Sequence, residues 1–179
     1  MKLFNTHMIK ISLMSMVLLY AQSATAGLND PEENFFQKTF GDYKEELDLA
    51  RGQGKTGILL MFEQDECPYC YRMRTTILNQ PAVQNYFRQY FSIFHIDIEG
   101  DTEIVDFDGN EMPEKDFAFK VNRVRATPVL MFYDLQGKKI VRYTGPTSSQ
   151  DEFMLLGKYV VDKHYLKMSF TRFKQSHQL

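Results

Sequence analysis

Cys67 and Cys70 are the only cysteines in this 179-residue chain, and they stand in the run Glu66-Cys67-Pro68-Tyr69-Cys70. Two thiols at this spacing suit a redox disulfide, a stabilising disulfide or half of a zinc site. A staple over so short a loop constrains the unfolded chain by only about 2 kcal/mol, less than a bridge between distant segments would. A structural zinc ion needs four ligands, and the histidines are scattered without ligand spacing. A redox pair is therefore the favoured interpretation, with no metal.

The segments around the cysteines predict a junction between a strand and a helix. Residues 57–62, GILLMF, form an apolar run typical of a buried strand, and a helical pattern follows the cysteines as far as Asn79. Cys67 is then expected at the helix N-terminus, where free N–H groups and the helix dipole favour a thiolate. Pro68 suits the first helical position. Cys70 follows after about one turn, so we expect Cys67 to attack and Cys70 to resolve.

The rest of the chain predicts an α/β fold with a mixed central sheet flanked by helices. Asp30 and Pro31 are expected to begin an N-terminal helix that continues to Gly52. Residues 102–112 alternate and turn at Asp108-Gly109, which predicts a small β-hairpin insertion. The further elements are a helix at 82–91 after Pro81, a strand at 91–100, a helix at 113–121 and an antiparallel pair at 127–134 and 139–145. A last amphipathic helix at 148–165 is capped by Ser148 or Ser149.

The acidic residues of the predicted hairpin allow a second interpretation as a calcium loop. Asp106, Asp108, Asn110 and Glu111 have alternating spacing, but the glycine does not stand where an EF-hand needs it. We therefore predict no metal site in the hairpin.

Thr127 and Pro128 precede a predicted buried strand that should lie beside the cysteines. A proline at this position is typical of either a plain trans bond at a strand start or a cis bond. A cis bond would leave the backbone of Thr127 free to pair with an extended substrate segment.

The first 26 residues have the pattern of a secretory signal peptide. Lys2 and Lys10 are basic, an apolar stretch too short for a membrane span follows, and small residues lead to an expected cleavage after Ala26. The alternative is an uncleaved anchor. The chain is mildly acidic, with a formal net charge of −2, and we expect no basic cluster, which argues against nucleic acid as a partner. We expect a periplasmic domain over residues 27–179 that is not embedded in the membrane.

The chain resembles the thioredoxin superfamily over nearly all of this region. The resemblance is carried by ECPYC after GILLMF, by ATPVLMFYDLQGKKIVRYTG at 126–145 and by the last amphipathic helix, and it is greatest to exported bacterial proteins of the SoxW type. It implies a thioredoxin fold, with attack by Cys67, resolution by Cys70, and partner binding at Thr127 and Pro128. It also implies that the Cys67–Cys70 disulfide is the redox centre and that no other cofactor is needed.

Two features of the sequence bear on this chemistry, and the first is a departure from the thioredoxin pattern. Thioredoxins have a buried aspartate six residues before the first cysteine, whereas Met61 stands there and cannot transfer a proton. Either Glu63 or water must replace it. Negative charge at Glu63, Asp65 and Glu66 opposes thiolate formation, and Arg72 and Arg74 further along the helix partly offset it. We therefore expect only a moderate lowering of the pKa of Cys67.

Together these features predict an exported thiol-disulfide oxidoreductase that reduces disulfides in partner proteins. A membrane-embedded thiol reductase would resupply its electrons. Tyr69, between the cysteines, is expected to be exposed and to contact the partner; the alternative is that it only covers the helix end. The alternatives are an oxidase or isomerase of the same fold, or a binding module without catalysis that uses the same groove.

Overall fold

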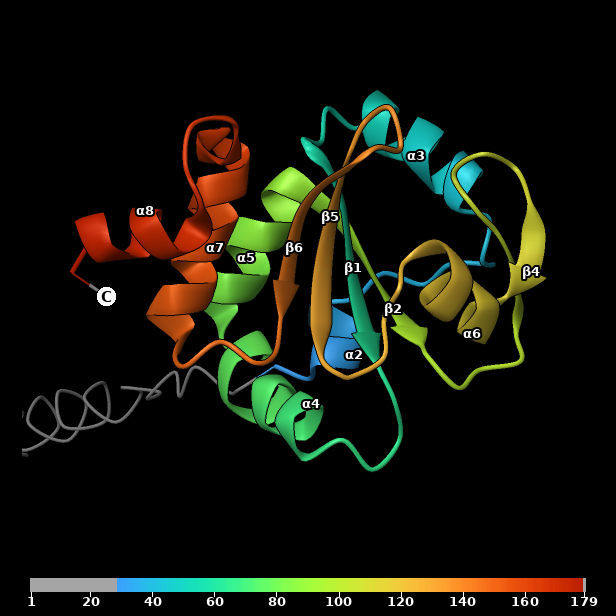
Figure 1. Cartoon of the computed structure of the whole chain (residues 1–179), viewed down its shortest axis with the longest axis horizontal. Helices are drawn as coiled ribbons and strands as arrows, with labels where there is room; N and C mark the ends of the chain where they lie inside the picture. Colours follow the sequence, from blue (N-terminus) through green and yellow to red (C-terminus); the bar gives the residue numbers. More distant parts are fainter. Residues whose placement is uncertain (1–28, 179) are drawn as a thin grey trace, which may run out of the picture.

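The computed structural model describes residues 29–178, which form a central sheet flanked by helices (Figure 1). The predicted leader and its cleavage after Ala26 lie outside the described residues. The sheet has the strand order β2-β1-β5-β6, and its strands are β1 (Gly57–Glu63), β2 (Phe91–Asp97), β5 (Val129–Asp134) and β6 (Lys139–Thr144). β1 runs parallel to β2 and antiparallel to β5, while β6 runs antiparallel to β5. The predicted mixed sheet is confirmed.

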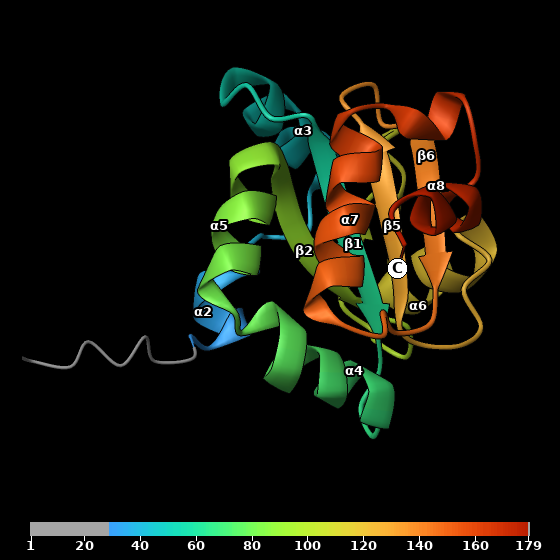
Figure 2. The same cartoon turned by 90° about the vertical axis from the view of Figure 1, so that its left-hand side faces the viewer.

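β1 lies inside the sheet, and all seven of its residues are buried. An unbroken apolar run suits this place because helices cover both faces of the strand. α5 (Pro81–Tyr90) and α7 (Gln150–Val161) pack on one face (Figure 2). The other face is covered by α3 (Tyr43–Gly52) and by the short helical segment formed by α6 (Glu114–Asp116) and η2 (Phe117–Val121).

The N-terminal region contains two helices where the sequence predicts one. Asp30 caps α2 (Pro31–Asn34) by accepting a hydrogen bond from the N–H of Glu32, as expected, but the helix ends after one turn. The chain resumes helical structure only at α3, after a new cap at Asp42. Phe35 and Phe36 turn into the core between the two helices, and burial of these rings outweighs the continuation of a short helix.

Gln37, in the connection between α2 and α3, covers the outer edge of β2. Its backbone N–H donates to the carbonyl oxygen of Ile93 at 2.8 Å. Its side-chain carbonyl oxygen accepts a hydrogen bond from the N–H of the same Ile93. Both outward-facing backbone groups of this edge residue are thus satisfied within the chain.

The predicted hairpin is confirmed as β3 (Glu103–Val105) paired with β4 (Glu111–Pro113). The carboxylate of Asp106 accepts hydrogen bonds from the backbone N–H groups of Asp108 and Asn110, at 2.9 and 2.8 Å. The side-chain amide of Asn110 also donates to it. These bonds explain the acidic spacing as a turn held by its own side chains.

The C-terminal region extends beyond the predicted last helix. Ser149 caps α7, as one of the two predicted candidates. After a single turn, η3 (His164–Leu166), the chain forms α8 (Phe170–Ser176), which the sequence did not predict. Lys174 in α8 donates a hydrogen bond of 2.8 Å to the buried Glu152 of α7, and this bond holds α8 against the body of the domain.

Candidate active site

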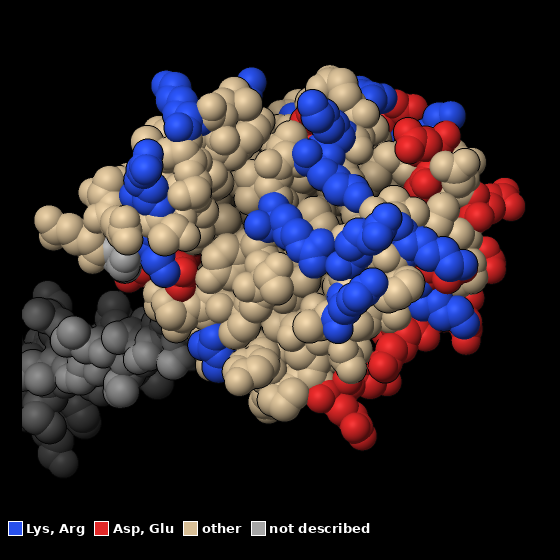
Figure 3. Space-filling model, viewed as in Figure 1, with Lys and Arg blue, Asp and Glu red and all other residues tan. Residues whose placement is uncertain are grey.

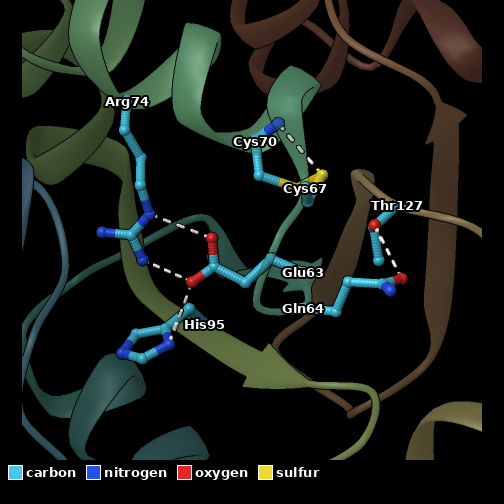
Figure 4. The surroundings of a disulfide bond; sticks show 7 residues. All are labelled: Glu63, Gln64, Cys67, Cys70, Arg74, His95 and Thr127. Atoms are coloured by element: carbon cyan, nitrogen blue, oxygen red, sulfur yellow. Dashed lines mark hydrogen bonds and ion pairs between the residues drawn. A yellow bond between two sulfur atoms is a disulfide. The ribbon is translucent and has the colours of Figure 1, made fainter.

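The strand-to-helix junction places the two cysteines together at the start of α4 (Pro68–Met73), where they form a disulfide (Figure 4). Cys67 is the N-cap residue and Pro68 is the first helical residue. The backbone N–H of Cys70 donates a hydrogen bond of 3.1 Å to the sulfur of Cys67. This N–H would otherwise lack a partner in the first turn, so Cys67 occupies an environment that favours negative charge on sulfur.

The two cysteines differ in their exposure to solvent. Cys70 is 3% exposed and belongs to the core cluster that also contains Met73 and Leu130. Cys67 is partly exposed, and Pro68 and Tyr69 beside it are exposed, Tyr69 to 59%. A protein that approaches the motif therefore meets Cys67 before Cys70.

Thr127 and Pro128 lie in the loop that leads into β5, next to the end of β1. The peptide bond between them is cis. The hydroxyl of Thr127 donates a hydrogen bond of 3.1 Å to the side-chain oxygen of Gln64, which directly follows β1 (Figure 4). Because β1 and β5 are paired, two residues that are 63 positions apart in sequence are brought to the same end of the sheet. The structure thus brings the predicted partner-binding loop to the cysteine loop.

Glu63, the predicted candidate for proton transfer, lies at the end of β1 with its side chain 12% exposed. Arg74 donates to both carboxylate oxygens, through Nε at 2.9 Å and through Nη2. Nδ1 of His95 lies 3.2 Å from Oε1. Burial acts to raise the pKa of Glu63, but the hydrogen bonds from His95 and Arg74 more than offset burial and lower it. Glu63 is thus ionised near neutral pH. Met61, which stands where thioredoxins have an aspartate, is fully buried in the core.

His95 is the site residue that sequence reasoning misplaced. The apolar pattern at 91–100 predicts that His95 is a hydrogen-bonded core histidine and not a base. The histidine does bond to Glu63, but its side chain is 44% exposed and packs against the ring of Phe36. β1 and β2 pair in parallel with Met61 opposite His95, which puts Glu63 and His95 on the same face. Only the strand register reveals this proximity, because the two residues are far apart in sequence.

A pocket of about 670 Å³ opens beside the disulfide. Its lining includes Cys67 and Cys70 as well as Glu63, Arg74 and His95. The sulfur atoms and the charged side chains therefore face one solvent-accessible space. Within residues 29–178, His, Cys, Asp and Glu side chains form no group of three or more that could hold a metal ion.

These features agree with a comparison at the level of sequence. The family model of the thioredoxin-like domain matches residues 43–160, which is more than half of the chain. The chain belongs to the thioredoxin-like family. None of the curated proteins compared with this thioredoxin-like chain matches it in sequence.

Solved structures of low sequence identity have the same fold. A thioredoxin-fold protein from Helicobacter pylori has a TM-score of 0.58 at 22% identity, over 69% of this chain and 82% of that chain. A thioredoxin from Thermus thermophilus has a TM-score of 0.54 at 25% identity, over 68% and 85% of the two chains. The DsbH oxidoreductase has a TM-score of 0.53 at 20% identity, over 72% and 85%. The thioredoxin fold expected from the sequence is confirmed.

The surface of this thioredoxin-like domain carries a basic cluster that the sequence does not show. Lys and Arg side chains gather over β5 and β6, and acidic side chains lie along the right-hand and lower margins (Figure 3). Lys139 is exposed, but partial burial lowers its pKa, and the nearby charges of Arg142 and Arg123 add to this effect. The expectation of no basic cluster is wrong on this face, because the fold joins cations from separate segments.

No helix of residues 29–178 is long and apolar enough to cross a bilayer.

Proposed function

We propose that this protein is an exported thiol-disulfide oxidoreductase that reduces disulfides in partner proteins. The observation that carries the proposal is the arrangement of a partly exposed Cys67 at a helix N-terminus with a buried Cys70 one turn away. This arrangement separates an attacking thiol from a resolving thiol.

The reaction proceeds by two thiol-disulfide exchanges. The thiolate of Cys67 attacks one sulfur of the partner disulfide and forms a mixed disulfide, while the other partner sulfur leaves as a thiolate and takes up a proton. The thiol of Cys70 then loses its proton and attacks the sulfur of Cys67. The second partner sulfur leaves as a thiolate, and the Cys67–Cys70 disulfide forms. Two electrons have passed to the partner, and a membrane-embedded thiol reductase returns two electrons to the protein.

The partner segment is proposed to bind between the two loops that meet beside the disulfide. Thr127 and Pro128 provide backbone groups on one side, and the exposed Pro68 and Tyr69 provide contacts on the other. The hydrogen bond from Thr127 to Gln64 joins these loops and supports their role as one binding surface. No additional cofactor enters this scheme, since the disulfide is the redox centre.

Two acceptors compete for the proton of Cys70. Glu63 lines the same pocket as Cys70 and is ionised, so its carboxylate is available. Its lowered pKa makes it a weak base, and water in the pocket is the alternative acceptor.

Charge near Cys67 supports reduction as the direction of the reaction. Asp65 and Glu66 are exposed beside Cys67 and oppose its thiolate form. Arg74, which the sequence suggests as compensation, is already paired with Glu63 and Glu32. A less stabilised thiolate makes the dithiol a better reductant.

Export to the periplasm is supported by the leader sequence and by the resemblance to the SoxW type.

The proposal is tested by the reduction of insulin disulfides with dithiothreitol as the electron source. The wild-type protein should accelerate insulin precipitation, and Cys67→Ser should abolish the acceleration. Cys70→Ala should instead accumulate mixed disulfides with captured partners, which mass spectrometry identifies. Full activity of Cys67→Ser in its cellular role would support a binding module without catalysis. A reduction potential near that of strongly oxidising proteins would favour the oxidase or isomerase.

A further inference from the structure

Glu63, Arg74 and His95 form a charged network on the wall of the pocket that both cysteines line (Figure 4). The carboxylate of Glu63 lies between the other two side chains and is bonded to each of them. The network is built from three elements that come together only in the fold, since Glu63 ends β1, His95 lies in β2 and Arg74 directly follows α4.

Arg74 also fixes the helix that carries the cysteines. Its guanidinium pairs with Glu32 of α2 as well as with Glu63, and lies 4.8 Å from the centre of the Phe36 ring. The side chain of Arg74 is only 21% exposed. Its charge is therefore already balanced, and its geometry is set by α2 and β1 on either side.

Four charged side chains face His95 from the elements packed around it. They are Glu63 of β1, Glu32 of α2, Arg74 of η1 (Arg74–Leu78) and Glu114 of α6. The imidazole lies between two carboxylates, with Nδ1 3.2 Å from Glu63 and Nε2 3.7 Å from Glu32. Glu32, Glu63 and Arg74 together carry one negative charge. Protonation of His95 cancels that charge, and loss of the proton restores it.

We propose that His95 is an electrostatic switch for the redox pair, and that its protonation state sets the charge of the pocket beside Cys67 and thereby the stability of the Cys67 thiolate. His95 acts through Glu63 and through the shared pocket, and it is a positioning residue that does not touch the reacting sulfur. The inference rests on the proposed function, in which Cys67 is the attacking thiol.

The sign of the effect follows from the charges. When His95 is protonated, the four side chains Glu32, Glu63, Arg74 and His95 carry no net charge, and fewer negative charges oppose the thiolate of Cys67. When His95 is neutral, the same four side chains carry one net negative charge, which repels the thiolate and favours the thiol. The hydrogen bond to Glu63 raises the pKa of His95 and outweighs the opposite effect of burial. The switch therefore operates above the ordinary histidine range of about 6.5.

The first test compares the thiolate of Cys67 in His95→Gln and in a control, His164→Gln. His164 packs on Phe173 of α8, in the segment that follows the C-terminal end of α7. The pKa of Cys67, followed by thiolate absorbance in the reduced protein, should rise by about half a unit or more in His95→Gln. His164→Gln should match the wild type. At about pH 6 the reduction potential of the wild type should be more oxidising than that of His95→Gln. This difference between the two proteins should vanish by about pH 9.

The second test needs no variant, since coupling between two sites is reciprocal. Proton NMR of His95 should give a higher pKa in the reduced protein, where Cys67 is a thiolate, than in the oxidised protein. Equal His95 titrations in both redox states, or an unchanged Cys67 pKa in His95→Gln, would overturn the switch. If the protonation of His95 and the thiolate of Cys67 are coupled but the protein fails to reduce insulin, the proposed function alone is overturned. If the protein reduces insulin but the two groups are not coupled, the switch alone is overturned.

Discussion

The backbone N–H of Cys70 points at the sulfur of Cys67 from a distance of 3.1 Å. This bond closes the first turn of α4 and makes Cys67 both the cap of the helix and the accessible end of the disulfide. Once the disulfide is reduced, the same N–H is available to a thiolate on Cys67. Cys70 has no equivalent place at the helix end, because it lies inside the first turn and in the core.

The two thiols should therefore ionise differently in the reduced protein. We expect the pKa of Cys67, measured in Cys70→Ser by absorbance at the thiolate band, to lie below the ordinary value of about 8.5. The pKa of Cys70, measured in Cys67→Ser, should lie at or above that value because of burial. The reverse order would show that the helix start does not stabilise the thiolate.

The hydroxyl of Thr127 should matter for partner reduction. Thr127→Val keeps the shape of the side chain but removes the donor to Gln64, and one lost hydrogen bond of about 1 kcal/mol predicts about a fivefold fall in kcat/KM for insulin. Thr127→Ser keeps the hydroxyl and should retain activity. Equal activities of the two variants would contradict a role for this bond in joining the loops.

Removal of the guanidinium of Arg74 should destabilise the fold. Arg74→Met leaves the carboxylate of Glu63 without its main partner, and we expect a loss of about 2–4 kcal/mol in the free energy of unfolding, measured with urea. Arg51 offers a matched control, because its pair with Asp48 is exposed. Arg51→Met should change stability by less than about 1 kcal/mol. Similar losses in the two variants would show that the Glu63 pair has no special weight.

Glu152 should make stability depend on acid pH. Burial acts to raise its pKa, but hydrogen bonds from Lys174 and Ser148 more than offset this and lower the pKa from 4.5 to about 2. A lowered carboxyl pKa stabilises the fold fully above about 4.5, and this contribution is lost as the pH falls toward 2.

The corresponding variant is Glu152→Gln, studied by urea unfolding at several pH values. At about pH 7 its free energy of unfolding should be about 2–3 kcal/mol below that of the wild type. This difference should shrink below about pH 4.5, as the wild-type carboxylate is protonated. Glu99→Gln, which changes an exposed glutamate, should lose little at any pH. A loss for Glu152→Gln that is the same at pH 3 and pH 7 would rule out the ionised carboxylate as its cause.

Local patterns in the sequence were sufficient to predict much of the fold and the position of the cysteines. The apolar run of β1, the proline after Cys67 and the Asp108-Gly109 turn each specify structure within a few residues. The cap at Ser149 is also a local feature, because its side chain accepts a hydrogen bond from the N–H of Glu152, three residues on. In each case the physical cause is local, so the sequence carries it directly.

The rest of the site depends on contacts between distant segments. Glu63 meets His95 only through the parallel register of β1 and β2. Arg74, directly after α4, reaches both Glu63 and Glu32 only because the fold brings the end of β1 and α2 beside it. The break between α2 and α3 has the same origin, since the core recruits Phe35 and Phe36. No local periodicity reports such pairings, so these features became visible only in the structure.

The bonds between Gln37 and Ile93 have a consequence for how molecules of this protein meet one another. An uncovered sheet border is a template on which a second chain can add a strand, and such addition leads to aggregation. Gln37 occupies that template on the β2 side. On the opposite side, β6 presents the exposed cations Lys139 and Arg142, which repel an identical copy. Replacement of these two cations by threonine should therefore promote self-association in concentrated solution.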